Sequence, residues 1–186
     1  MLEEIKDIVA NAEQLYDQDQ VAAAISKMAA PINSQLADSN PLVLCVLNGG
    51  IITTGQLLLQ LNMPLTVDSI NVSRYQNQTA GGEITWLSTP HTDMNDRIVL
   101  IVDDILDEGI TLQAIYQYCL EHGASAVYSA VLIDKQLGHS KPVQADFIGL
   151  EAENRYLFGS GMDYKGYLRN VPGIYACALN HQDKQS

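Results

Sequence analysis

Three carboxylates, Asp103, Asp104 and Asp107, lie in one short stretch directly after the apolar run 98–102. The apolar run predicts a fully buried strand, and Thr111 begins an amphipathic helix after a glycine. Neighbouring carboxylates repel one another, so a partner must offset that repulsion, and a divalent metal ion or a ribose diol would do so. A strand that leads through acids into a helix N-terminus predicts a site for an anionic ligand at the carboxyl end of a sheet.

A second unit of the same kind occurs earlier in the chain. The apolar run 42–47 predicts another buried strand, the segment 48–50 (Asn-Gly-Gly) ends it, and residues 53–61 predict the following helix. Backbone amides at such a turn can bind phosphate, although a glycine pair by itself is equally compatible with an ordinary turn. The segment 107–111 offers a second phosphate cradle, and two cradles on one sheet predict a substrate phosphorylated at two positions.

The other apolar patterns place these two units in a larger sheet. Predicted helices cover 2–16, 21–36 and 112–120, with Pro31 kinking or breaking the second, and predicted strands cover 65–72, 84–87, 126–133, 147–150 and 174–178. The polar segment 73–82 lacks apolar periodicity and predicts a mobile excursion that acts as a lid. Strands that alternate with helices predict an α/β fold with a mostly parallel, twisted sheet flanked by helices.

Length and composition exclude several classes of protein. The 186 residues suit a single domain, and a net charge of −12 disfavours nucleic acid and anionic membranes as partners. No apolar run approaches the about 20 residues of a membrane span, and the acidic, amphipathic N-terminus does not look like a signal peptide. The three cysteines are widely spaced in apolar surroundings, which indicates reduced core residues in a cytoplasmic protein.

The segment 101–111, IVDDILDEGIT, closely resembles the phosphoribosyl-diphosphate motif of the type I phosphoribosyltransferases. Four further motifs of that family have similar segments here, in the family's order between residues 47 and 172. They are the diphosphate loop (47–50), the start of the flexible catalytic loop (73–75), the strand whose lysine meets the purine (131–135), and the C-terminal hood over the purine (156–163 and 167–172). This pattern resembles the hypoxanthine–guanine branch of the family.

The resemblance implies a fold, a reaction and a cofactor. The expected fold is a single phosphoribosyltransferase domain over 1–186, with a core of about 37–135 and a small hood from 1–36 and 136–186. The expected reaction is purine salvage by a hypoxanthine phosphoribosyltransferase. It transfers the 5-phosphoribosyl group from 5-phosphoribosyl 1-diphosphate to hypoxanthine or guanine and yields IMP or GMP and diphosphate. Mg²⁺ is the implied cofactor, and a homodimer or homotetramer is the implied assembly.

The resemblance also implies roles for single residues. Asp107 would act as the general base beside the purine N7. Lys135 would donate to the purine O6, and a 6-amino purine is disfavoured because an ammonium group cannot accept a hydrogen bond. The implied contacts are Asp103 and Asp104 with the ribose; Asp107, Glu108, Gly109, Ile110 and Thr111 with the 5′-phosphate; Asn48, Gly49 and Arg169 with diphosphate; Lys135, Tyr156, Leu157 and Asp163 with the purine; Asp103, Asp104 and Asp163 with Mg²⁺; and Arg74 and Tyr75 in the flexible loop.

Four residues depart from the pattern of the family. Asn48 stands where many relatives have lysine, Arg74 where serine is common, Glu108 in place of the usual threonine, and Ile110 at a position that is often basic or apolar. Because two neighbouring anions repel, the Glu108 carboxylate is expected to turn away from the bound phosphate while its backbone N–H still faces it. A cation of the same or a neighbouring chain would then pair with this carboxylate.

Two other functions stay open at this point. A nucleotide sensor that has lost catalysis would keep the fold, but the intact set Asp107, Lys135 and Asp163 argues against it. A Mg²⁺-dependent phosphotransfer or receiver protein built on the adjacent acids would leave the hood motifs unexplained. Single residues also have simpler interpretations, since the adjacent acids could be solvated loop residues, Lys135 a surface charge and Tyr156 a core aromatic.

Overall fold

The computed structural model describes residues 1–74 and 84–178 of the chain. Over these residues the helices are α1 (Leu2–Asn11), α2 (Gln18–Leu36), α3 (Ile51–Leu58) and α4 (Ile110–Glu121). The strands are β1 (Glu13–Tyr16), β2 (Leu42–Leu47), β3 (Thr66–Arg74), β4 (Ile84–Ser88), β5 (Ile98–Leu106), β6 (Ala126–Gln136), β7 (Phe147–Glu153), β8 (Leu157–Phe158) and β9 (Ile174–Ala176).

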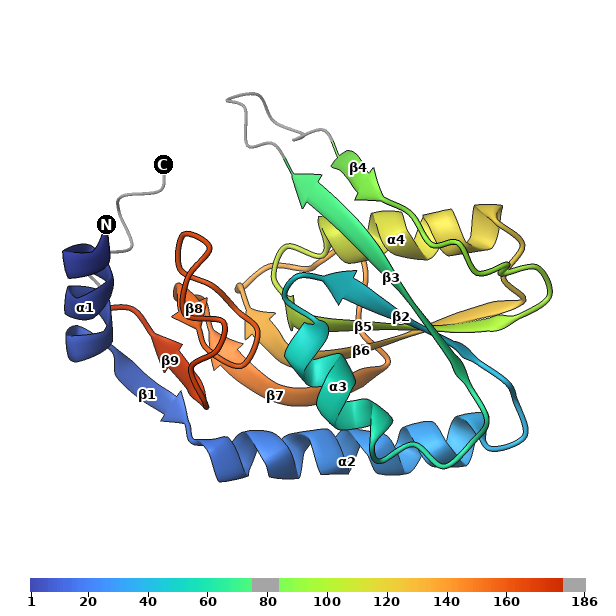
Figure 1. Ribbon diagram of the computed structural model, residues 1–186, viewed down its shortest axis with the longest axis horizontal. Coiled ribbons are helices and arrows are strands. Elements are labelled where there is room, and N and C mark those ends of the chain that lie inside the picture. The colour runs from blue at the N-terminus through green and yellow to red at the C-terminus, as the bar shows by residue number, and fades with distance from the viewer. Residues whose placement is uncertain (75–83, 179–186) are drawn as a thin grey trace.

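The larger sheet has six strands in the order β4-β3-β2-β5-β6-β7. Every neighbouring pair is parallel except β3 and β4, which are antiparallel at one edge. The predicted α/β fold with a mostly parallel sheet is therefore confirmed. From β2 the chain passes through α3 to one side, and from β5 it passes through α4 to the other side (Figure 1). Ligands bind at such a switch point in open α/β sheets, outside the carboxyl ends of the strands.

The apolar run in β5 is continuous because both faces of the sheet are covered. Leu100 and Val102 belong to the core cluster that contains residues of α2 and α3. Val99 and Ile101 belong to a second cluster that contains residues of α4. Successive side chains of a strand point to opposite faces, so both layers fix the position of β5 and of the acids that follow in it.

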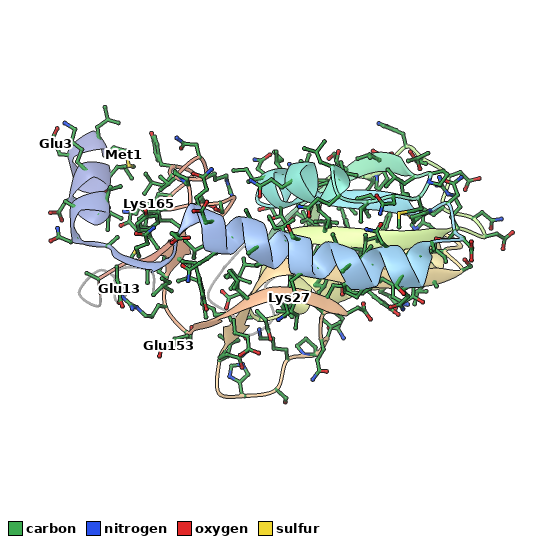
Figure 2. The ribbon with its side chains drawn as sticks, turned by 90° about the horizontal axis from the view of Figure 1, so that it is seen from below. Met1, Glu3, Glu13, Lys27, Glu153 and Lys165 are labelled. Carbon is green, nitrogen blue, oxygen red and sulfur yellow. The ribbon has the colours of Figure 1, made fainter. Side chains whose placement is uncertain are left out.

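A smaller sheet with the order β1-β9-β8 joins the two ends of the chain. In Figures 1 and 2 this sheet and α1 lie at one end of the molecule, while α2 runs along the larger sheet. Ile5 and Ile8 of α1 pack with Phe158, Tyr164 and Cys177. The regions predicted as hood, 1–36 and 136–186, thus supply the smaller sheet. They also supply the edge strand β7 of the larger sheet and the helix α2 that covers it.

The structure differs from the predicted elements at several places. The predicted helix 2–16 ends at Asn11, because the following residues pair as β1 with β9, and Asp17 then caps α2 through a reciprocal contact with Gln20. Of the kink or break predicted at Pro31, a break is wrong, since α2 continues through this residue. β5 extends to Leu106, so the two adjacent acids lie within the strand and not in a loop after it.

Two further findings complete the description of the fold. Cys45, Cys119 and Cys177 are all buried and free. In the described part of the chain, no helix combines the length and the apolar character needed to cross a membrane. The segment 73–82, predicted as a lid, falls largely outside the described residues.

Candidate active site

A cleft of about 410 Å³ opens at the carboxyl ends of β2, β5 and β6. The residues 156–172, called the hood segment below, contribute to its wall from the side of the smaller sheet. Most residues assigned a role from the sequence line this one cleft: Asn48, Gly49, Asp103, Asp104, Asp107, Glu108, Gly109, Ile110, Thr111, Lys135, Tyr156, Leu157, Asp163 and Arg169. These residues come from four separate segments of the chain.

Asp103 and Asp104 are the most deeply placed acids of the cleft. Only 6% of Asp104 is exposed, and the Asp103 Oδ1 accepts a hydrogen bond from the Asp104 backbone N–H at 2.8 Å. Burial, together with the charge of Asp104, raises the pKa of Asp103 well above its usual value. Burial also raises the pKa of Asp104, whose Oδ2 lies 3.9 Å from the Arg169 guanidinium. A bound cation or a pair of hydroxyl donors would relieve the repulsion between these two acids.

The turn after β2 packs directly against this acid pair. The peptide bond between Leu47 and Asn48 is cis. A Cβ atom on Gly49 would collide with the carboxylate of Asp104, and a Cβ atom on Gly161 of the hood segment would collide with the Gly49 carbonyl oxygen. Gly161 also has a φ of +112°, a backbone conformation that glycine adopts readily. The two glycines therefore let the turn, the acid pair and the hood segment approach one another closely.

Asp107 and Lys135 form an ion pair at the carboxyl ends of β5 and β6. The Lys135 Nζ lies 3.0 Å from the Asp107 Oδ2, and the lysine side chain is 12% exposed against 50% for the aspartate. Leu106 and Asp134, the residues immediately before this pair, are register partners in the two strands. The expected base and the expected donor to the purine are thus neighbours in space although 28 residues separate them in the sequence.

The segment 107–111 forms the turn from β5 into α4. Gly109 has a φ of +80° and is the N-cap of α4, so the turn requires a left-handed residue just before Ile110. Free backbone N–H groups at a helix N-terminus favour an anion. The Glu108 Oε2 lies 3.3 Å from the His139 Nε2, so the carboxylate has a partner in the same chain. The attraction is that of an ion pair only when His139 is protonated.

Asp163 and Arg169 of the hood segment contact each other in this cleft. The Asp163 Oδ1 lies 2.5 Å from the Arg169 Nη2, and the Asp163 Oδ2 accepts the Gly166 backbone N–H at 2.6 Å. The Arg169 Nη1 also donates to the Gly161 carbonyl oxygen at 2.7 Å. Both carboxylate oxygens of Asp163 are therefore engaged, and a metal ion or a diphosphate group would compete with these contacts.

Tyr156 and Leu157 begin the hood segment and also line the cleft. The Tyr156 ring lies edge-on to Tyr164, with the ring centroids 5.4 Å apart and an interplanar angle of 75°. Leu157 is buried and pairs with Ala176 across the smaller sheet, which fixes its backbone. The predicted purine-contacting residues of the hood thus rest on the sheet formed by the two ends of the chain.

Of the other predicted site residues, Arg74 ends β3 and Tyr75 lies outside the described residues. Within 1–74 and 84–178, no group of three or more His, Cys, Asp or Glu side chains is arranged to hold a metal ion. Asp103, Asp104 and Asp163 therefore do not form a complete ligand set. Mg²⁺ often binds through one or two carboxylates, substrate phosphates and several waters, and the adjacent acids fit that mode of binding.

Sequence reasoning missed three features that shape the site. The close packing of Gly161 on Gly49 and the contact of His139 with Glu108 join segments that are distant in the sequence. Lys141 is largely buried beside Asp134 and donates to the Leu106 carbonyl oxygen, which is 35 residues away. The sequence held only weak signals for them, such as the glycines that flank Ser160.

Comparison with known proteins gives one consistent family. A model of the phosphoribosyl transferase domain matches residues 11–165. Hypoxanthine-guanine phosphoribosyltransferase of Bacillus subtilis (strain 168) is 29% identical over 161 residues, covering 86% of this chain and 89% of its own length. Hypoxanthine-guanine-xanthine phosphoribosyltransferase of Tritrichomonas foetus is 32% identical over 161 residues, covering 86% and 88%.

Solved structures agree with these sequence relatives. A hypoxanthine phosphoribosyltransferase from Staphylococcus aureus superposes with a TM-score of 0.85 at 21% identity, covering 90% of this chain and 92% of that one, and this likeness shows the fold. A hypoxanthine-guanine-xanthine phosphoribosyltransferase superposes with a TM-score of 0.80 at 30% identity, covering 89% and 96%. The fold is that of the type I phosphoribosyltransferases, and the chain belongs to the phosphoribosyltransferase family.

Proposed function

We propose that this phosphoribosyltransferase salvages purines, joining hypoxanthine or guanine to the 5-phosphoribosyl group of 5-phosphoribosyl 1-diphosphate. The observation that carries the proposal is the contact of Lys135 with Asp107 at 3.0 Å, inside the cleft that also contains the adjacent acids and the two phosphate-binding turns. A donor and an acceptor side by side suit the O6 and N7 edge of a 6-oxopurine. The relatives named above act on hypoxanthine, guanine or xanthine, which supports the same class of base.

In the proposed reaction the purine N9 forms a bond with C1′ of the ribose while the bond from C1′ to the diphosphate oxygen breaks. Asp107 takes the proton that the purine releases at N7, and Lys135 donates a hydrogen bond to O6. The Tyr156 ring stacks on the base and, with Leu157, keeps it against this pair. Each of these groups acts on the base and none acts on the leaving group.

Other residues of the chain act on the sugar and the phosphates. The backbone N–H groups of the turn 107–111 bind the 5′-phosphate at the start of α4. Asp103 and Asp104 bind the ribose hydroxyls, and their negative charge favours the positive charge that develops on the ribose. The turn at Asn48 and Gly49, with Arg169, binds the diphosphate. Mg²⁺, when bound near these acids, supplies positive charge that stabilises the departing diphosphate.

The proposal is tested by mixing the protein with 5-phosphoribosyl 1-diphosphate, Mg²⁺ and hypoxanthine and measuring both diphosphate and IMP. We expect the two products in equal amounts, with turnover proportional to the protein concentration. Binding of 5-phosphoribosyl 1-diphosphate in a calorimeter without any product would contradict the proposal and would favour a nucleotide sensor. An Asp107→Asn variant purified in parallel controls for a contaminating enzyme from the host.

A further inference from the structure

The segment between β6 and β7, residues 137–146, lies against the turn that leads into α4. His139 of this segment contacts the Glu108 carboxylate at 3.3 Å. A Cβ atom on Gly109 would lie 3.3 Å from Pro142 and 3.4 Å from both Lys141 and Val143, so the segment passes directly over the Gly109 backbone. The β6–β7 segment therefore supports the proposed phosphate cradle from the side that faces away from β2.

Lys141 makes two hydrogen bonds from a largely buried side chain of this segment. Its Nζ donates to the Asp134 Oδ1 at 2.6 Å and to the Leu106 carbonyl oxygen at 2.7 Å. The lysine side chain is 10% exposed and the Asp134 side chain 19%. Ammonium groups are rarely buried to this degree unless paired, because loss of hydration must be offset by charged or hydrogen-bonding partners. One ammonium group thus connects the last residue of β5 with Asp134, its register partner in β6.

The position of this connection in the sheet is informative. Leu106 and Asp134 are the last register partners of the β5–β6 ladder, and the next residue of each strand belongs to the ion pair of Asp107 and Lys135. A second cavity of about 590 Å³ lies beside this end of the ladder, lined by Leu106, Asp134 and Lys135 together with most of the β6–β7 segment. Lys141 also lines this cavity, and its two hydrogen bonds lie where the β5–β6 ladder stops.

We infer that Lys141 is a positioning residue, which holds the end of the β5–β6 ladder in register so that Asp107 and Lys135 lie side by side, where each can reach its own atom of a 6-oxopurine. The predicted effect of Lys141 on base selectivity rests on the proposed function. Its structural part, the dependence of the Lys135–Asp107 contact on Lys141, holds for the protein whatever its substrate. A misplacement of about 1 Å in such a pair can lower the rate about 100-fold.

The test compares two variants with a control. Lys141→Met keeps the length of the side chain and removes the ammonium group, but it leaves Asp134 without its counter-ion and could unfold the protein. The double variant Asp134→Leu with Lys141→Met removes both charges, and replacing both members of a buried pair by apolar groups is often tolerated. Lys27→Met, at an exposed position on α2, is the matched control and should behave as wild type (Figure 2).

Two measurements on the folded double variant decide the inference. In its crystal structure we expect the Lys135–Asp107 contact to be lost, and an unchanged contact would overturn the inference. In kinetics we expect kcat/KM for hypoxanthine to fall about tenfold or more, and the preference for hypoxanthine over adenine to fall with it. A preference equal to that of wild type would also overturn it, because a purely stabilising role changes the amount of active protein and leaves this ratio unchanged.

The same measurements separate this inference from the proposed function. If the wild-type protein formed no nucleotide from any 6-oxopurine, the proposed function would be wrong, and the crystal structure of the double variant would still decide the role of Lys141. If the wild type were selective and the double variant equally so, the proposed function would stand and the inference about Lys141 would fail.

Discussion

The contact between Lys135 and Asp107 has to open when a purine binds, because the two side chains are assigned different atoms of the base. In the structure the two charged groups lie 3.0 Å apart, with the lysine mostly buried. An ammonium group that is already held in place by a carboxylate loses little further freedom when it turns to the purine O6. Asp107 therefore keeps the Lys135 ammonium group at the place where the proposed base binds.

Asp107→Asn tests the role of the aspartate in the chemical step. The amide has the same size but does not accept a proton, so we expect kcat to fall by about 10²–10⁴ with little change in KM. Steady-state kinetics with hypoxanthine give both constants. Asp38→Asn, at an exposed position, is the control and should leave both unchanged. A kcat of Asp107→Asn within a few-fold of wild type would show that Asp107 is not the base.

Repulsion between Asp103 and Asp104 lowers the free energy of unfolding, and a substitution that removes one charge should raise it. Because the folded state raises the pKa of Asp103, it retains a proton to higher pH than the unfolded state does. The free energy of unfolding therefore decreases as the pH rises from about 4 through the raised pKa. We expect Asp103→Asn to be more stable than wild type at neutral pH, with the difference shrinking toward pH 4.

Urea unfolding of the ligand-free proteins at several pH values measures this difference. Asp38→Asn should show no such gain, because that carboxylate is exposed. If Asp103→Asn were no more stable than wild type at neutral pH, the repulsion between the adjacent acids would be compensated by the rest of the site.

At the scale of the elements, the sequence predicted the strands that are buried on both faces and missed those that depend on distant partners. The run 98–102 was recognisable because every residue must be apolar in a strand covered by helices on both sides. β8 contains only Leu157 and Phe158, and β1 followed a helical pattern of apolar residues without interruption. Both exist because β9 supplies their hydrogen bonds, and β9 lies far from β1 in the sequence.

The candidate site was predictable to a similar extent. The motif 101–111 marked the acids and the phosphate cradle, because strand, acids, glycine and helix follow one another directly in the chain. The contacts of Lys135 with Asp107 and of Lys141 with the Leu106 carbonyl oxygen depend on how separate elements meet, and the contact of Arg169 with Asp163 depends on how the hood segment folds back on itself. No local pattern of residues carries that information.

The turn between β2 and α3 offers a direct test of how closely these elements must approach. Gly49→Ala would force the added methyl group onto the Asp104 carboxylate, so we expect kcat/KM to fall by roughly 10–100-fold. Gly55→Ala is the matched control, because a Cβ atom there meets nothing within 4 Å and the residue lies inside α3. The control should keep full activity and gain about 0.5–1 kcal/mol in stability from helix propensity. Equal kinetics for the two variants would show that the turn has room to move.

At the scale of the whole molecule, the net charge of −12 opposes the binding of a substrate that carries a phosphate and a diphosphate. The turns around the cleft offset part of this repulsion with backbone N–H groups, and Arg169 adds one guanidinium group. The adjacent acids increase the repulsion. The positive groups of the cleft are fewer than the negative charges of the acids and of the proposed substrate, so additional positive charge must come with the substrate. Mg²⁺ is the cation that suits carboxylate and phosphate oxygens.

Removal of the metal ion should therefore abolish the reaction. We expect no nucleotide formation in excess EDTA and full recovery when Mg²⁺ is added above the EDTA concentration. Circular dichroism in both buffers controls for unfolding and should be the same. Full activity in thoroughly chelated buffer would contradict the assignment of metal-organising roles to Asp103, Asp104 and Asp163.

The central claim is that the cleft selects a 6-oxopurine, and competition between purine bases measures this most directly. The protein is supplied with 5-phosphoribosyl 1-diphosphate and Mg²⁺, and kcat/KM is determined for hypoxanthine, guanine, xanthine and adenine. Because the Lys135 ammonium group donates to O6 and cannot accept from a 6-amino group, we expect hypoxanthine and guanine to be used at least about 100-fold better than adenine. Adenine used as efficiently as hypoxanthine and guanine would contradict the claim.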